Sequence, residues 1–456
     1  MTAQSGAVAT LPADWGGTAG RICWRRSIGW LLLLGPFFFL SYGYANAVAA
    51  DREIGTAVVF AWERQLPFWA WTIVPYWSID LLYGLSFLYC RDRFTVDRHA
   101  LRLLSVQVLS VACFLAFPLR FSFARPDTDG LFGLLFDVLM DFDQPYNQAP
   151  SLHIGLLVVI WIRFALGTQG LARLVVHGWA ALIALSVLTT YQHHFIDVPT
   201  GALAGLLCVW LWPDRGASPL AGWRWTRDST RRRLGAIYLG AASLLGAIAL
   251  LGGGAALWLL WPAVALLLVA LIHLGPGARG FQKHDGRPGV AARCLLAPYM
   301  LGAWLNSRWW TRGRRRADRV AGEVWLGRMP SAADLRAGRF GSLVDLTAEL
   351  PAPRGNWRYV GLPWLDLVAP DARALLAVAR HIETLSAEGP VLVCCALGFS
   401  RSACAVAAWL LLSARADGVD DAVAQVERAR PGVVLGAAHR RALAACLVLI
   451  GAEEQP

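Results

Sequence analysis

The stretch from Val391 to Ser402 combines a nucleophile with a site for an anion. It reads Val-Leu-Val-Cys-Cys-Ala-Leu-Gly-Phe-Ser-Arg-Ser, which predicts a strand, a seven-residue turn from Cys395 to Arg401, and a helix to about Ser413. Such a turn directs backbone N–H groups and the positive end of the helix dipole at one small cavity. The dipole and Arg401 favour the thiolate of Cys395, and the guanidinium can bind two phosphate oxygens. The stretch therefore predicts a phosphate site beside a nucleophilic thiol.

The order cysteine, five residues, arginine, serine resembles the signature of the cysteine-dependent protein tyrosine and dual-specificity phosphatases. The resemblance implies that Cys395 attacks phosphorus to form a phosphocysteine, that Arg401 holds the transferred group, and that Ser402 helps the thiolate leave. In the same way, Gly398 would permit the tight turn of the loop. The expected fold of this part is an α/β phosphatase domain.

Two positions outside the loop also bear on this resemblance. The general acid of the family is an aspartate a few tens of residues upstream, and Asp366, four residues before Pro370, fits that role. The family usually has histidine directly before the nucleophile, whereas this chain has Cys394. Cys394 is either a small buried hydrophobic residue or a thiol that traps oxidised Cys395.

The composition excludes a single soluble domain. Of 456 residues, 56% are hydrophobic and only 16% are charged, and 22 are tryptophan. The net charge of +11 comes from arginines in short stretches beside apolar segments, which indicates membrane topology and no nucleic-acid partner. The nine cysteines show no paired spacing, and a thiolate enzyme needs a reducing compartment, so we expect no structural disulfides.

The apolar segments predict a polytopic α-helical membrane domain of about eight spans, with a six-helix core. The first run is too long for a signal peptide and is expected to be retained. Placing the N-terminus inside puts the arginine-rich stretches on the cytoplasmic side, and an even number of spans returns residue 275 onward to the cytoplasm. The eight runs are about 28–50, 67–90, 100–123, 151–167, 171–190, 195–212, 234–252 and 254–274, and the acidic loop 124–150 falls outside.

Residues 291–310 are ambiguous. Arg293 and Pro298 interrupt the run and two tryptophans end it, which favours a helix lying in the membrane interface over a ninth span. The chain then becomes soluble. Short strands are expected at 324–326, 343–346, 358–360 and 391–394, and helices at 371–387, 402–413, 418–429 and 437–451.

A second group of residues that could do chemistry lies at the starts of two predicted spans. Ser151 and His153 open the fourth span, and His193 and Asp197 open the sixth, all on the outer side. The four-residue spacing places His193 and Asp197 on one helix face, where the carboxylate can fix the imidazole tautomer. The other ring nitrogen is then free to act as a nucleophile. A capping or interfacial role for these side chains is the alternative.

This second group resembles the type 2 phosphatidic acid phosphatase superfamily, and its inositol phosphorylceramide synthase branch in particular. Pro150-Ser-Leu-His153 is similar to the Pro-Ser-Gly-His motif, and His193 and Asp197 follow Ser186 at the spacing of the third motif. The resemblance implies that His193 is a phosphohistidine nucleophile, that Asp197 is its partner, and that His153 is the acid for the leaving alcohol.

The phosphate-binding cations of that superfamily are only partly present. Val187 replaces the arginine of the third motif, and Pro118 stands at the lysine position of the first motif, of which Arg125-Pro126 remains. By the resemblance, Arg125 and Ser151 would bind phosphoryl oxygens, with Arg120 as a possible substitute for the missing lysine. A degenerate site kept as an anchor is therefore a second alternative.

The whole chain resembles a bacterial fusion of the two families, a bifunctional phosphatase of a multi-pass inner or plasma membrane. The cytosolic site would hydrolyse a phosphoprotein or phospholipid and the outer site a lipid phosphate, with no metal or cofactor. The alternatives are a membrane half that only anchors or senses lipid, or one that transfers a phospho-headgroup between lipids. The expected divisions are a cytoplasmic segment 1–26, the six-span domain 27–212, two further spans 213–274, an interfacial helix and basic linker 275–319, and the phosphatase domain 320–456.

Overall fold

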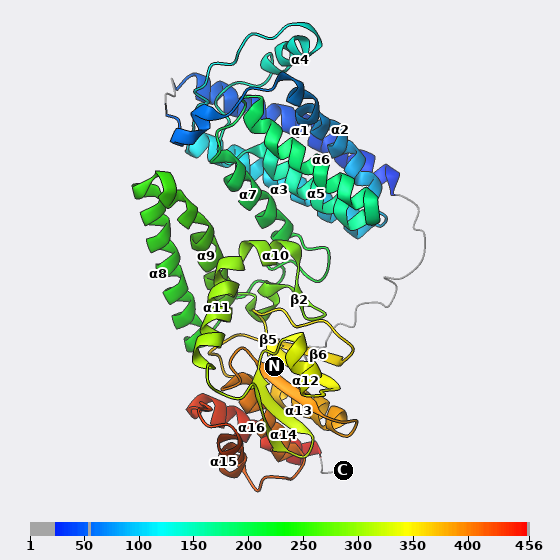
Figure 1. Cartoon of the computed structure of the whole chain (residues 1–456), viewed down its shortest axis with the longest axis vertical. Helices are drawn as coiled ribbons and strands as arrows, with labels where there is room; N and C mark the ends of the chain where they lie inside the picture. The colour runs from blue at the N-terminus through cyan, green and yellow to red at the C-terminus, as the bar shows by residue number, and fades with distance from the viewer. Residues whose placement is uncertain (1–22, 53–55, 454–456) are drawn as a thin grey trace. The chain divides into compact units, whose positions relative to one another are not determined.

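The computed structural model describes residues 23–52 and 56–453, and its contacts divide the chain at residue 214 (Figure 1). Among the described residues, those up to residue 214 form a helical unit, and those from residue 215 onward form a unit that combines a helical hairpin with an α/β sheet. Each unit is described separately below.

The helical unit places a helix in each of the six apolar runs predicted for it. Its α-helices are α1 (Trp24–Ala50), α2 (Ile73–Ser86), α3 (Arg93–Ala116), α4 (Gly130–Met140), α5 (Leu152–Gly167), α6 (Gly170–Thr189) and α7 (Asp197–Leu211). Three short 3₁₀ helices, η1 (Ala61–Gln65), η2 (Ala70–Thr72) and η3 (Phe87–Tyr89), lie between α1 and α3. Helix α4 was not predicted; its apolar run is too short for a span.

Glycines let α5 and α7 approach closely. A Cβ at Gly201 would lie 2.5 Å from the carbonyl oxygen of Ser151, and one at Gly205 would lie 2.5 Å from that of Gly155. The close approach brings the N-terminal ends of the two helices together, where the backbone N–H of Ser151 donates to the carbonyl of Asp197 at 3.1 Å. The residues that open the fourth and sixth predicted spans are therefore neighbours.

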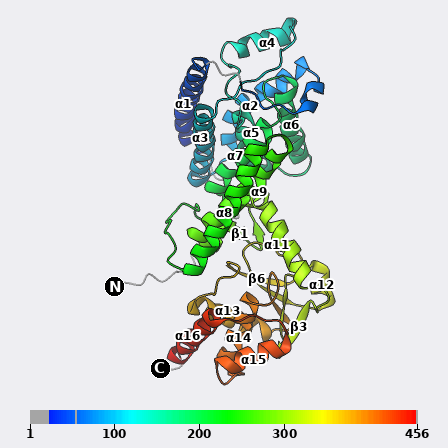
Figure 2. The same ribbon diagram turned by 90° about the vertical axis from the view of Figure 1, so that its left-hand side faces the viewer.

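Five helices in residues 23–52 and 56–453 are long and apolar enough to cross a membrane, which indicates membrane association. Three of them, α1, α3 and α6, belong to the first unit. The other two are α8 (Ser229–Gly252) and the run Gly254–Leu274, made of η4 (Gly254–Leu259) and α9 (Leu260–Leu274). Helices α8 and α9 pack side by side as a hairpin (Figure 2). Its turn contains Gly253 at φ +58°, a conformation that glycine adopts without strain.

The segment after the hairpin contains short elements. It consists of η5 (Gly277–Phe281), the two-residue strands β1 (Lys283–His284) and β2 (Arg287–Pro288), α10 (Val290–Leu295) and α11 (Ala297–Trp310). The single helix expected over 291–310 is thus two helices, and the break at Leu296 places Pro298 in the first turn of α11. Proline suits the first turn of a helix because its missing N–H has no partner to lose there.

The C-terminal sheet has five strands in the order β3-β4-β7-β5-β6. The strands are β3 (Ala317–Ala321), β4 (Val324–Arg328), β5 (Ser342–Thr347), β6 (Arg358–Trp364) and β7 (Val391–Cys395), and all pairs except β3–β4 are parallel. The helices are α12 (Ala332–Ala337), α13 (Ala372–Ser386), α14 (Arg401–Leu412), α15 (Val419–Ala429) and α16 (Ala437–Glu453). Edge strand β3 and the short α12 were not predicted. Strand β7 is central and fully buried, which fits its β-branched, apolar sequence.

Candidate active sites

The loop between β7 and α14 joins the central strand to a helix N-terminus. Cys395 is the last residue of β7 and Arg401 is the first residue of α14. Gly398 lies midway at φ +80°, and a Cβ there would lie 2.5 Å from the backbone carbon of Gly327 in β4. Only glycine fits that combination of positive φ and close backbone approach. The loop is therefore held tightly over the end of the sheet.

The sulfur of Cys395 accepts two hydrogen bonds within this loop. The backbone N–H of Gly398 and the hydroxyl of Ser402 both donate to Sγ at 3.2 Å. The side chain is buried, with 3% of Cys395 exposed. Donors aimed at sulfur stabilise its negative charge, so the geometry suits a thiolate at the start of a helix dipole.

Arg401 is fully buried and held by two carboxylates. Its terminal nitrogens donate to the two carboxylate oxygens of Glu349 at 2.9 and 2.6 Å, and one lies 3.0 Å from Oδ1 of Asp366. A further bond goes to the carbonyl of Trp364 at 2.9 Å. Within the described residues, the Nε–H of Arg401 has no partner. That donor is available for an oxygen of a bound phosphate.

Glu349 was not predicted as part of the site, although it pairs directly with Arg401. Burial by itself would raise the pKa of Glu349, but the charge and hydrogen bonds of Arg401 lower it below its ordinary value. Glu349 is therefore a carboxylate that fixes the guanidinium plane. The available signal was an acidic residue directly after a buried strand, two residues beyond Thr347.

Arg430 and His439, which were not predicted from the sequence, also form hydrogen bonds with the catalytic loop. The guanidinium of Arg430 is buried and donates to the carbonyls of Gly398 at 2.9 Å and Leu397 at 3.2 Å, and to Asp318 at 2.7 Å. The ring of His439 in α16 lies 3.0 Å from the hydroxyl of Ser400. Both residues lie far from Cys395 in sequence, so no local pattern pointed to them.

Cys394 is fully buried in an apolar cluster on the other side of β7, with Leu343, Met329 and Ala396 among its members. Burial raises the pKa of the Cys394 thiol above its ordinary value. A buried, protonated thiol is a poor partner for redox chemistry, so the geometry favours the structural role for Cys394.

The sequence model of the dual specificity phosphatase catalytic domain matches residues 324–446. This range contains Asp366, Cys395, Arg401 and Ser402, as well as Glu349 and Arg430. Residues 324–446 belong to the dual-specificity phosphatases.

Solved structures also match the chain. The active form of Tk-PTP is 30% identical over 29% of this chain and 97% of its own, with a TM-score of 0.27. A putative dual specificity phosphatase of mouse, complexed with zinc tungstate, is 25% identical over 31% of this chain and 93% of its own, with a TM-score of 0.29. PTPMT1 in complex with PI(5)P is 16% identical over 31% and 99%, also with a TM-score of 0.29. No curated protein matches the chain.

Outside the dual-specificity phosphatase domain, the helical unit brings His193 and Asp197 together. Nδ1 of His193 lies 3.2 Å from Oδ2 of Asp197, and the same oxygen accepts the backbone N–H of His194 at 3.0 Å. The expectation that both residues share a helix face is wrong, because α7 begins at Asp197 and His193 lies in the preceding turn. The carboxylate at the helix start reaches back to the ring instead.

His194 is engaged elsewhere. Its Nδ1 lies 3.2 Å from Oε2 of Glu63, and its Nε2 is 3.1 Å from the backbone nitrogen and hydroxyl of Ser122. Glu63 also accepts the backbone N–H of Phe195 at 2.8 Å. His194 therefore joins three segments of the unit, which leaves His193 as the histidine available to a ligand.

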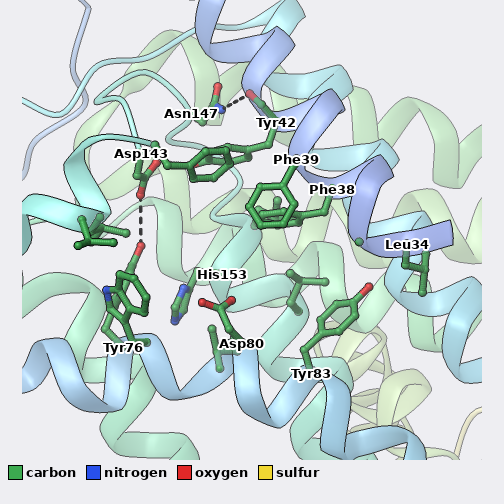
Figure 3. Close-up of a pocket in the computed structure, with 18 of the residues that line it drawn as sticks. Leu34, Phe38, Phe39, Tyr42, Tyr76, Asp80, Tyr83, Asp143, Asn147 and His153 are labelled. Atoms are coloured by element: carbon green, nitrogen blue, oxygen red, sulfur yellow. Dashed lines mark hydrogen bonds between the residues drawn. The ribbon is translucent and has the colours of Figure 1, made fainter. Parts of the chain in front are cut away.

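A cavity of about 480 Å³ lies beside this histidine (Figure 3). Its lining includes His153, His193 and Asp143, and the carboxylate of Asp143 accepts the hydroxyls of Tyr42 at 2.6 Å and Tyr76 at 3.4 Å. The ring of Tyr76 stacks on His153 with ring centroids 4.1 Å apart. Apolar side chains line the rest of the cavity: Leu34, Phe38 and Phe39 of α1, Leu139 of α4, Phe142 just beyond α4, and Leu156 of α5.

The predicted phosphate ligands of the helical unit are only partly gathered. Arg125 donates to the carbonyls of Thr190 and Tyr191 at 3.2 and 3.4 Å, close before His193 in the chain. Ser151 is buried and caps α5, accepting the N–H of Ile154 at 3.3 Å. Arg120 is exposed and stacks over Tyr146. None of the residues lining the cavity is lysine or arginine, and Asp80 and Asp143 give its wall acidic groups.

Proposed function

We propose that the chain is a membrane-attached phosphatase whose dual-specificity domain hydrolyses phosphate monoesters through Cys395. The observation that carries this is the sulfur of Cys395 with its two hydrogen-bond donors, beside a buried arginine that has a free donor. A phosphoryl group bound there would accept hydrogen bonds from backbone amides and from the Nε–H of Arg401. It would also lie at the positive end of the helix dipole. These groups stabilise the charge that builds up on its oxygens.

In the proposed reaction, the thiolate of Cys395 attacks phosphorus and the ester P–O bond breaks. Asp366, whose side chain is about one-third exposed at the edge of the site, gives its proton to the leaving oxygen. Water then attacks the phosphocysteine, its proton passes to Asp366, and the S–P bond breaks. The hydroxyl of Ser402 stabilises the departing thiolate. The substrate is a phosphoprotein or a membrane phospholipid.

We further propose that the helical unit is a lipid phosphatase or phosphotransferase that uses His193. The cavity supports this, because apolar side chains that could pack against acyl chains line it together with two histidines. His193 would attack phosphorus, Asp197 would hold its tautomer, and His153 would protonate the leaving alcohol. Arg125 and Ser151, with Arg120 as a possible third residue, would bind the phosphoryl oxygens at the edge of the cavity.

A degenerate anchor and a headgroup transferase are the alternatives for the helical unit. The absence of lysine and arginine among the lining residues of the cavity favours both over simple phosphate hydrolysis, because little charge there would hold a free phosphate. In all three cases the protein is proposed to be a multi-pass membrane protein with its phosphatase domain in the cytoplasm, and the sites need no metal or cofactor.

Purified full-length protein in detergent tests these proposals. Phosphate release is measured from a phosphotyrosine peptide and from a panel of phospholipids, for wild type, Cys395→Ser and His193→Ala, with phospholipid products analysed in parallel. The bifunctional proposal predicts that each substitution abolishes a different activity. An effect of Cys395→Ser alone, with no lipid hydrolysed or transferred, would leave the helical unit as an anchor. New phospholipid without free phosphate would identify a transferase.

A further inference from the structure

The segment that follows the α8–α9 hairpin is built into the phosphatase site. In α11, the buried hydroxyl of Ser307 donates to the carbonyl of Ala396 in the catalytic loop, and Arg308 donates to the carbonyl of Met329 at 3.2 Å. In β1, the buried ammonium of Lys283 lies 2.6 Å from Asp345 of β5. The segment is therefore fixed to the loop that holds Cys395, although it lies outside the matched range 324–446.

The same segment is fixed to the helical hairpin. Trp261 of α9 donates its indole N–H to the carbonyl of Cys294 in α10 at 2.9 Å. Arg231, in the first turn of α8, donates to the carbonyls of His273 and Gly275 at 3.0 Å each, which closes the hairpin at the end facing the segment. Both α8 and α9 lie in runs apolar enough to span a membrane. The segment that contacts the catalytic loop is therefore hydrogen-bonded to α9, and Arg231 joins the start of α8 to the end of α9.

Aromatic side chains also join α11 to the hairpin. The ring of Tyr299 in α11 packs against Tyr238 of α8 and Phe281 of η5, with centroids 5.7 and 6.0 Å apart. Burial raises the pKa of Tyr299, and the charges of Glu349 and Asp366 raise it further. Tyr299 thus joins α11 to the hairpin and to η5.

Helix α11 also presents an exposed aromatic surface. The α11 face consists of the exposed side chains Leu301, Trp304, Leu305 and Trp309. Arginines accompany it, since Arg312 stacks over Trp309 at 3.7 Å and Arg308 over Trp304 at 5.5 Å. Tryptophan next to arginine is typical of the interface of an anionic membrane leaflet, where the indole lies at headgroup depth and the guanidinium meets phosphate.

We propose that the α11 face rests on the membrane surface and that the Cys395 site takes a phosphate monoester carried by a lipid of that leaflet. The inference rests on the proposed cysteine-dependent activity. We assign a lipid surface as the partner of the α11 face because the hairpin that adjoins α11 is itself apolar enough to be in the membrane. A hairpin inserted in the bilayer would hold the α11 face next to the lipid headgroups. Tethering at the leaflet raises the effective concentration of lipid substrates without any new contact.

The test uses full-length protein carrying His193→Ala, so that the helical unit contributes no hydrolysis, reconstituted in phosphatidylcholine vesicles. Two probes are compared: phosphatidic acid in the same vesicles, and soluble p-nitrophenyl phosphate. The double variant Trp304→Ser/Trp309→Ser is expected to lose about tenfold or more in kcat/KM for phosphatidic acid. Its rate on the soluble ester is expected to stay within about twofold, which also reports that the domain is folded. The control is Val448→Ser, a still more exposed apolar position on α16.

Five results would overturn the inference. Hydrolysis of the soluble ester without hydrolysis of phosphatidic acid excludes the lipid substrate, and so does faster turnover of a phosphotyrosine peptide. An equal loss on both probes shows that the α11 face acts structurally. Conversion of a dimer into a monomer by the double variant, with the rate on phosphatidic acid unchanged, makes the face an interface between copies. If neither probe is hydrolysed, and adding Cys395→Ser changes no rate, the proposed cysteine-dependent function is wrong as well.

Discussion

The carboxylate of Glu349 and the guanidinium of Arg401 meet as two parallel forks, both buried, with nitrogen–oxygen distances of 2.9 and 2.6 Å. This pairing uses both terminal nitrogens of Arg401 and leaves its Nε–H free. The orientation of the arginine in the phosphatase site is therefore set before a substrate arrives, which lowers the ordering cost of binding.

Replacing Glu349 by glutamine should destabilise the phosphatase domain by about 3 kcal/mol, because a buried arginine loses its main counter-charge. The misplaced guanidinium should lower kcat/KM on a soluble phosphate ester by about tenfold or more. Thermal unfolding in detergent and ester hydrolysis measure the two effects. Glu388→Gln, whose carboxylate pairs with Arg358 on the surface, is the control and should change stability by at most about 1 kcal/mol.

The same pair predicts a pH dependence. Because the folded state lowers the pKa of Glu349, its contribution to stability is present above the unfolded pKa of about 4.3 and is lost as the pH falls through the lower folded value. Thermal unfolding at acidic pH should therefore show a smaller loss of stability in Glu349→Gln than in wild type. Parallel pH profiles of the two proteins would show that the pair contributes no such linkage.

Gly398→Ala should destabilise the domain by about 2–4 kcal/mol, since a positive φ and a backbone overlap both oppose the new Cβ. Gly341 is the matched control, because a Cβ there has nothing within 4 Å. Thermal unfolding and ester hydrolysis of Gly398→Ala and Gly341→Ala are compared. A fully active, equally stable Gly398→Ala would mean that the loop adopts a different backbone.

Arg430→Ala should lower the free energy of unfolding by about 3 kcal/mol, because the carbonyls of Leu397 and Gly398 and the carboxylate of Asp318 all lose a hydrogen-bond donor. Arg428, two residues earlier and largely exposed, is the control, and its alanine variant should change stability by at most about 0.5 kcal/mol. Chemical denaturation followed by tryptophan fluorescence measures both. Equal losses of stability in the two variants would show that Arg430 does not stabilise the catalytic loop.

Cys394→Ala should leave both the phosphatase rate and its recovery from peroxide unchanged within about twofold, because a buried thiol with a raised pKa is a poor nucleophile. The measurement is inactivation by hydrogen peroxide followed by reactivation with dithiothreitol. Loss of reversible recovery in the variant would instead assign Cys394 the trapping of oxidised Cys395.

Asp197→Asn should lower any release or transfer of lipid phosphate by the helical unit about 100-fold or more, since the tautomer of His193 is no longer fixed. Hydrolysis of a phosphotyrosine peptide by the same protein should be unaffected. Asp137→Asn in α4 is a control at an exposed carboxylate. An unchanged rate of lipid phosphate release or transfer in Asp197→Asn would show that the His193–Asp197 pair takes no part in the reaction.

Local pattern explains what the sequence could predict of this protein. A buried strand, a glycine turn and a helix N-terminus lie within twelve residues around Cys395, so the phosphate loop could be predicted from neighbours alone. The helices of the membrane part likewise follow from long apolar runs. Each of the eight predicted runs contains a helix, although five helices in the described residues meet the length for a span.

Contacts between distant segments explain what the sequence could not predict. Glu349 and Arg430 act on the catalytic loop from 46 and 35 residues away, and Lys283 pairs with Asp345 of β5 from 62 residues away. Each looks like an ordinary surface charge in its own surroundings. The turn before Asp197 was assigned to a helix because four-residue spacing also fits a helical face. Edge strand β3 has few apolar residues, so its pairing with β4 was hidden.

The most direct test of the central claim is a rapid acid quench of the full-length protein with a ³²P-labelled phosphate monoester, in the Ser402→Ala variant. Slower thiolate departure in this variant should let the phosphoenzyme accumulate. The account predicts label bound covalently in up to one equivalent per chain, and none when Cys395→Ser is added. Label that persists in the double variant, or phosphate release that does not depend on Cys395, would contradict the account.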